Sequence, residues 1–117
     1  MRMFRSRRTI GLAVGGALSF VVGAALAEQA WSALSDQIGI QNFKFGPNPL
    51  TVPVGTRVTW INHDEEPHTI TSADPADPFK SAALDTGDKF SVVFDKPGSY
   101  KYFCSVHPFM VGTVVVK

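Results

Sequence analysis

From residue 38 to the end of the chain, hydrophobic and polar residues alternate in short runs separated by Pro, Gly, Asn and Asp. Alternation with a period of two is typical of β-strands with one buried face. We expect strands at residues 38–45, 50–54, 57–62, 68–71, 89–94, 100–104 and 110–116. Because no later run has a helical period, the pattern predicts an all-β protein, an antiparallel β-sandwich of a single domain.

Alternation also predicts which side chains lie together. Val58 and Trp60 share one face of their strand, which makes them core candidates. In the strand that follows residue 99, Tyr100, Tyr102 and Cys104 share a face.

The first 27 residues have a different pattern. Arg2, Arg5, Arg7 and Arg8 precede an uncharged run, residues 9–27, that ends in Ala-Leu-Ala. A basic start, an apolar middle and an Ala-x-Ala end predict a secretory signal peptide at residues 1–27. Cleavage would release a domain of residues 28–117 into the periplasm.

Two details leave alternatives for this segment. The stretch at residues 6–10, Ser-Arg-Arg-Thr-Ile, resembles a twin-arginine export signal. The uncharged run also approaches the length of about 20 residues that spans a bilayer, so an uncleaved anchor is the competing interpretation. The protein would contact a membrane only in that case.

Removal of residues 1–27 changes the charge balance. The chain has 11 Lys and Arg residues and 10 acidic ones, all of the acids at or beyond Glu28. Without the four leader arginines the net charge is −3 (7 minus 10). No basic patch remains for binding nucleic acid. The chain has a single Cys, which cannot form an internal disulfide, so metal ligation explains it well.

Four residues offer metal ligands. Cys104, His107 and Met110 follow one another at three-residue steps, so a tight turn can direct all three inward. His68 would come from a neighbouring strand end. A thiolate, two imidazoles and a thioether are the ligands of blue-copper electron-transfer sites. Zinc is the alternative, although Met is not among its usual ligands.

Each of these residues also has an ordinary structural interpretation, as a buried thiol, a core Met or a polar His. Their combination at this spacing favours the metal site. His63 lies in the polar run at residues 62–66 and is expected to be a solvated loop residue.

The chain resembles the cupredoxins, especially their amicyanin and plastocyanin branch. The resemblance lies in Cys-x-x-His-Pro-Phe-Met at residues 104–110, Val-Thr-Trp-Ile-Asn at 58–62, Pro-His at 67–68 and Gly-Thr-Val-Val-Val at 112–116. It covers nearly all of the chain after the first thirty-odd residues. It implies Greek-key connectivity and copper ligation by His68, Cys104, His107 and Met110.

Some positions depart from amicyanin. Ser105-Val106 stands where amicyanin has Thr-Pro, Thr69 replaces an Asn, and Glu66 replaces an apolar residue. Val106 keeps a backbone N–H that proline lacks. Because hydrogen bonds near the thiolate tune the copper potential, we expect a potential above that of amicyanin.

These features predict an exported electron carrier with one type 1 copper ion. An enzyme is not expected, because four protein ligands leave no open position for a substrate. A periplasmic copper carrier or buffer is the alternative function, although Met110 is the only Met after residue 27.

We expect a monomer whose partners are redox proteins, a cytochrome c or a dehydrogenase. Pro67, Pro108 and Phe109 flank the histidines and suit brief docking with a small interface. The acidic run Asp64-Glu65-Glu66 is either a solvated surface or a steering patch for a basic cytochrome.

Overall fold

A computed structural model describes residues 34–117, which form one compact unit. The predicted signal peptide at residues 1–27 lies outside the described residues. The unit contains eight strands: β1 (Ser35–Gln41), β2 (Lys44–Gly46), β3 (Leu50–Val52), β4 (Thr56–Asn62), β5 (Thr71–Ser72), β6 (Lys89–Phe94), β7 (Gly98–Phe103) and β8 (Val111–Val116). Within this range no helix has the length and apolar character needed to span a membrane.

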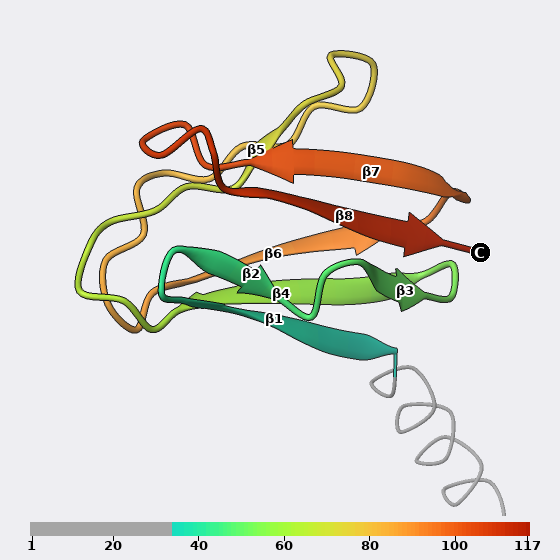
Figure 1. The fold of residues 1–117 in the computed structure, drawn as a ribbon. Coiled ribbons are helices and arrows are strands. Elements are labelled where there is room, and N and C mark those ends of the chain that lie inside the picture. The colour runs from blue at the N-terminus through green and yellow to red at the C-terminus, as the bar shows by residue number, and fades with distance from the viewer. Residues whose placement is uncertain (1–33) are drawn as a thin grey trace, which may run out of the picture. The chain divides into compact units, whose positions relative to one another are not determined.

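The strands form two sheets that face each other as the layers of a sandwich (Figure 1). One sheet has the order β2-β1-β4-β6 and the other the order β3-β8-β7-β5. The chain passes repeatedly between the sheets, as expected for Greek-key connectivity. The predicted single-domain β-sandwich is therefore confirmed.

The sheets are mixed, whereas the hydrophobic pattern predicted purely antiparallel ones. β1 runs parallel to β4, and β3 runs parallel to β8. Between β2 and β4 the chain crosses to the opposite sheet, where it forms β3. It then returns to the first sheet, where β4 runs in the same direction as β1. Alternation reports which face is buried and carries no information on strand direction.

Two predicted strands differ in kind from the observed ones, and the other five agree to within two residues at each end. The run at residues 38–45 is a hairpin, in which β1 pairs antiparallel with β2. Asn42 and Phe43 form its turn, with φ of 54° and 60°. The pattern missed this turn because it contains no glycine. At residues 68–71, His68 forms only an isolated bridge with Leu84, and β5 begins at Thr71.

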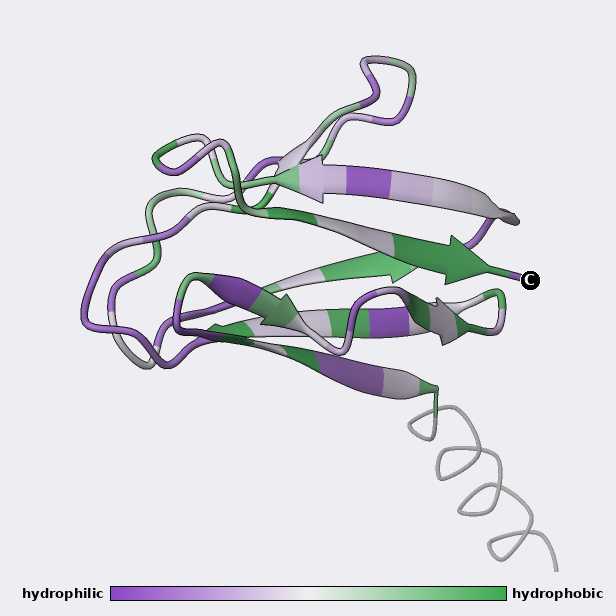
Figure 2. Cartoon of the chain, in the orientation of Figure 1, coloured by the Kyte–Doolittle hydropathy of each residue, from purple (hydrophilic) through white to green (hydrophobic). Residues whose placement is uncertain are grey.

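The core lies between the layers and centres on aromatic residues. Val58 and Trp60 are fully buried, as predicted. The Trp60 ring lies 5.3 Å from that of Tyr102, at an interplanar angle of 81°. Figure 2 shows hydrophobic stretches in strands of both sheets. Cys104 is also fully buried, so its thiol belongs to the edge of this core.

Tyr102 packs over a glycine on the neighbouring strand. Tyr102 and Gly112 are cross-strand partners of β7 and β8. A Cβ at Gly112 would lie 2.4 Å from the ring and hydroxyl of Tyr102. Burial raises the pKa of Tyr102 to about 12, so the phenol stays neutral at physiological pH.

We predict that Gly112→Ala destabilises the protein by about 1–3 kcal/mol, because the added methyl overlaps the buried Tyr102 ring. Denaturant unfolding measures this change. Gly46→Ala is the matched control, since a Cβ there meets nothing within 4 Å. Equal stability of the two variants would show that the Tyr102 ring leaves room for a side chain at position 112.

Candidate metal centre

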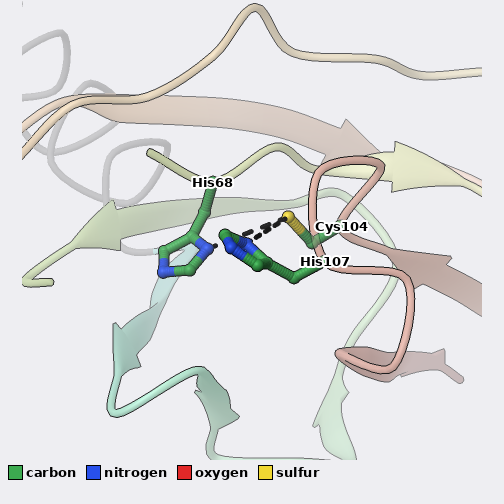
Figure 3. Close-up of side chains that lie close together, drawn as sticks. All are labelled: His68, Cys104 and His107. Atoms are coloured by element: carbon green, nitrogen blue, oxygen red, sulfur yellow. Dashed lines mark hydrogen bonds between the residues drawn. The ribbon is translucent and has the colours of Figure 1, made fainter. Parts of the chain in front are cut away.

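His68, Cys104 and His107 converge at one end of the sandwich. Their ligand atoms all lie within 4.8 Å of one another. The Cys104 Sγ lies 3.8 Å from Nδ1 of His68 and 3.9 Å from Nδ1 of His107 (Figure 3). Two imidazole nitrogens therefore face one sulfur atom.

A short loop between β7 and β8 brings Cys104, His107 and Met110 together. The Cys104 N–H donates to the Met110 carbonyl at 3.1 Å, which closes the loop at its base. The Met110 N–H donates to the His107 carbonyl at 2.9 Å. Met110 is buried, with 2% of its surface exposed. The segment from Cys104 to Met110 is therefore a tight turn, and ligation by the Met110 side chain stays a prediction.

His68 reaches the same place from a different segment. Its backbone exchanges two hydrogen bonds with Leu84, N–H to carbonyl in each direction, at 3.1 and 2.8 Å. Its side chain is fully buried. This contact holds His68 beside the Cys104 loop, although the two residues are far apart in the chain.

Asp64 determines which nitrogen of His68 faces the sulfur. The Asp64 Oδ2 lies 2.9 Å from the His68 Nε2. When Nε2 carries the proton and donates to the carboxylate, Nδ1 is left as a free ligand atom. A carboxylate behind a ligand histidine also increases the basicity of the imidazole.

The same carboxylate accepts two backbone hydrogen bonds. The Asn42 N–H donates to Oδ1 at 2.7 Å and the Phe43 N–H to Oδ2 at 2.9 Å. Burial acts to raise the pKa of Asp64, but these amides and His68 hold the pKa below its ordinary value. Asp64 is therefore not part of a solvated acidic run, whereas Glu65 and Glu66 are exposed.

The sulfur of Cys104 accepts a hydrogen bond from the Thr69 N–H at 3.3 Å. The Thr69 Oγ1 accepts from the Ser105 N–H at 2.8 Å. Thr69 thus joins the His68 segment to the Cys104 loop. Within residues 34–117, Thr69 is the only backbone donor to this sulfur, so the expected role of the Val106 N–H in tuning the potential has no support.

Phe43 is a site residue that the sequence did not indicate. Its ring lies edge-on to both histidines, with centroids 5.3 Å from His68 and 5.1 Å from His107. It is also 6.5 Å from the ring of Phe109. Phe43 lies far from either motif in the chain and carries no ligand atom, so neither motif could identify it. His63 is exposed, as expected, and lies outside the cluster.

The surface around the site is apolar and open. His107 is partly exposed, and Phe109 and Val106 are 71% and 50% exposed. Pro67 and Pro108, which flank the two histidines in sequence, are exposed as well. Of these residues, Phe109 packs against His107, with ring centroids 6.1 Å apart.

The donor set suits copper. Thiolate and thioether sulfurs favour Cu(I), and imidazoles bind both copper oxidation states. Magnesium and calcium prefer oxygen ligands, and the convergent ligand atoms here are sulfur and nitrogen. The residues present therefore fit a copper ion.

Comparison with known families agrees with this chemistry. The model of copper binding proteins of the plastocyanin/azurin family matches residues 33–117. The chain belongs to this family. The members of this family are cupredoxins, and copper is the cofactor of this chain.

Its relatives include amicyanins and plastocyanins. Amicyanin-alpha of Methylorubrum extorquens is 32% identical over 102 residues, which cover 85% of this chain and 86% of that protein. Amicyanin of Paracoccus versutus is 31% identical, over 68% of this chain and 63% of its own length. Plastocyanin of Scenedesmus fuscus is 33% identical, over 62% of this chain and 86% of its own length. The chain thus spans less than two thirds of the Paracoccus versutus relative.

Solved structures show the same similarity. The purple cupredoxin from Nitrosopumilus maritimus has 44% identity and a TM-score of 0.64, covering 69% of this chain and 98% of that one. An oxidized amicyanin variant has 32% identity and a TM-score of 0.68, covering 72% and 83%. A Cu-containing nitrite reductase from Thermus scotoductus has 30% identity and a TM-score of 0.66, but only 22% of that chain is covered, against 72% of this one.

We predict that Asp64→Asn weakens Cu(II) binding by about 10–100-fold and raises the reduction potential, because the His68 ring loses its carboxylate partner and a negative charge is lost. Competition with a copper chelator measures the affinity. Glu65→Gln is the matched control, because Glu65 is exposed and next in the chain. If both variants bind Cu(II) like the unmodified protein, Asp64 does not support the ligand.

Proposed function

We propose that His68, Cys104, His107 and Met110 hold one copper ion and that the protein carries single electrons between redox partners. Family membership supports a small copper electron carrier. The observation that carries the proposal is the convergence of the Cys104 Sγ with Nδ1 of both histidines, where Asp64 holds the His68 ring and the Thr69 N–H donates to the sulfur. When bound, copper supplies a one-electron redox centre.

The protein supplies rigidity. Asp64 holds the ring of His68, Thr69 donates to the sulfur, and the Cys104–Met110 hydrogen bond closes the loop. Ligands that stay in place when the metal changes valence keep the cost of reorganisation low. Four protein ligands also leave no position for a substrate, which supports a carrier rather than an enzyme.

The route for electrons lies at His107. This ligand is partly exposed, lies against the rings of Phe43 and Phe109, and precedes Pro108 in the chain. An apolar rim around a redox edge suits brief docking, because electron-transfer complexes have small interfaces. A cytochrome c or a dehydrogenase is the proposed class of partner.

Export completes the proposal. A signal peptide at residues 1–27 would deliver residues 28–117 to the periplasm as a monomer. This part of the proposal is based on the order of features in that segment, which has a basic start, an apolar middle and an Ala-x-Ala end. An uncleaved anchor is the competing form.

The competing function is a copper carrier or buffer, in which the metal rather than the electron is transferred. The two functions differ in what leaves the protein. We expect the Cu(I) form to reduce a basic cytochrome c, and the resulting Cu(II) form to accept another electron from a chemical reductant, over many cycles. The absorbance of the cytochrome measures electron transfer, and copper analysis of the recovered protein measures how much metal is retained.

Retention of copper through these cycles supports electron transfer. Loss of copper to a chelator or to a copper-binding peptide, without reduction of the cytochrome, would favour the carrier function.

Exposed acids near the site offer a test of steering. We predict that Glu65→Gln combined with Glu66→Gln lowers the association rate with a basic cytochrome and weakens its dependence on ionic strength. Stopped-flow kinetics at several salt concentrations measures both effects. Asp36→Asn is the control, an exposed acid on β1 outside this run. An unchanged salt dependence in the double variant would mean that these acids are only a solvated surface.

A further inference from the structure

The Asn42–Phe43 turn is strained at a position where a hairpin favours glycine. Gln41 pairs with Lys44, so Asn42 and Phe43 are the two turn residues, and both have positive φ. Two-residue turns with positive φ at both positions favour Asn followed by Gly. A bulky residue in this conformation is strained and persists only where other contacts hold it.

Asp64 supplies those contacts. Its carboxylate accepts the N–H groups of both turn residues and also lies 2.9 Å from the His68 Nε2. Asp64 is itself held in place, since its N–H donates to the Asn62 side chain at 2.9 Å and its carbonyl accepts from the Thr86 hydroxyl at 2.6 Å. One nearly buried carboxylate, 11% exposed, therefore links the turn to the histidine.

The turn directs the Phe43 ring against the histidines. Both interplanar angles are 85°, and the His68 and His107 rings are themselves 5.0 Å apart. Phe43 thus contacts His68 in two ways, directly through its ring and indirectly through its amide and Asp64. Phe109 also packs against His107, with centroids 6.1 Å apart, but has no hydrogen bond to Asp64.

We propose that Phe43 is a positioning residue for His68, acting directly through its ring and, by way of its amide, through Asp64. The strained turn, the carboxylate and the aromatic ring form one unit that fixes the orientation of the His68 imidazole. This inference deepens the proposed function and rests on it, since His68 is a proposed copper ligand. Phe43 is 37% exposed, so the same unit forms part of the surface that a partner would meet.

The first test uses copper-free protein and does not depend on metal binding. Nitrogen-15 NMR of the histidine rings, recorded above the histidine titration range, distinguishes the two neutral tautomers. We expect His68 to carry its proton on Nε2, and Phe43→Leu to shift its signals toward a mixture of tautomers. Phe43→Tyr, which keeps the ring, and Phe109→Leu, which leaves the Asp64 unit intact, should match the unmodified protein.

Identical His68 signals in Phe43→Leu and the unmodified protein would overturn the proposal. An equal change of the His68 signals in Phe109→Leu would also overturn the proposal. The cause would then be the loss of any aromatic ring that packs against the histidines, not the loss of Phe43 in particular. Phe43→Gly guards against misfolding, since glycine adopts positive φ without strain. It should shift the His68 signals as Phe43→Leu does and unfold at no lower temperature than the unmodified protein.

The second test is a double-mutant cycle on the reduction potential of the copper-loaded protein. We expect Phe43→Leu to shift the potential, and at least half of that shift to disappear in the Asp64→Asn background. Phe109→Leu should shift the potential equally in both backgrounds. Equal shifts for Phe43→Leu in both backgrounds would overturn the proposal. If the protein holds no copper, the proposed function fails, and the NMR experiment still decides the role of Phe43.

Discussion

The antiparallel pairing of β7 with β8 is the constraint on which the metal site depends. Phe103 pairs with Val111, and the next hydrogen bond, from the Cys104 N–H to the Met110 carbonyl, closes the loop that contains three of the four proposed ligands. A shift of this register by one residue would turn the strand side chains to the opposite faces. The close contact of Tyr102 with Gly112 lies in the same pair of strands, so core packing and site geometry support each other.

The fourth ligand position shows why the site needs a whole domain. His68 is held by Leu84, Asp64 and the neighbouring Thr69 N–H, which joins its segment to the Cys104 sulfur. Each of these partners comes from a loop or strand end at the same edge of the sandwich. These hydrogen bonds hold the sulfur and the imidazole nitrogens close together. Such a fixed arrangement suits a metal that changes valence while its ligands stay in place.

Sequence reasoning indicated residues that the structure brings together, His68, Cys104 and His107, but not the contacts that support them. Three-residue steps between Cys104, His107 and Met110 indicated a ligand loop, and alternation predicted the burial of Val58 and Trp60. The parallel pairing of β1 with β4 was not predictable, because alternation is the same in both strand directions. The turn at Phe43 was missed since it lacks glycine, and Asp64 resembled a solvated acid because its contacts are 21 and 22 residues away in the chain.

The most direct measurement is the visible absorption spectrum of the protein loaded with Cu(II), then reduced and reoxidised. A Cu(II) ion bound by a thiolate and two imidazoles should give an intense charge-transfer band. We expect this band to bleach on reduction, to return on oxidation and to be absent in Cys104→Ala. A colourless protein, or one that binds zinc in preference to copper, would contradict a blue-copper electron carrier.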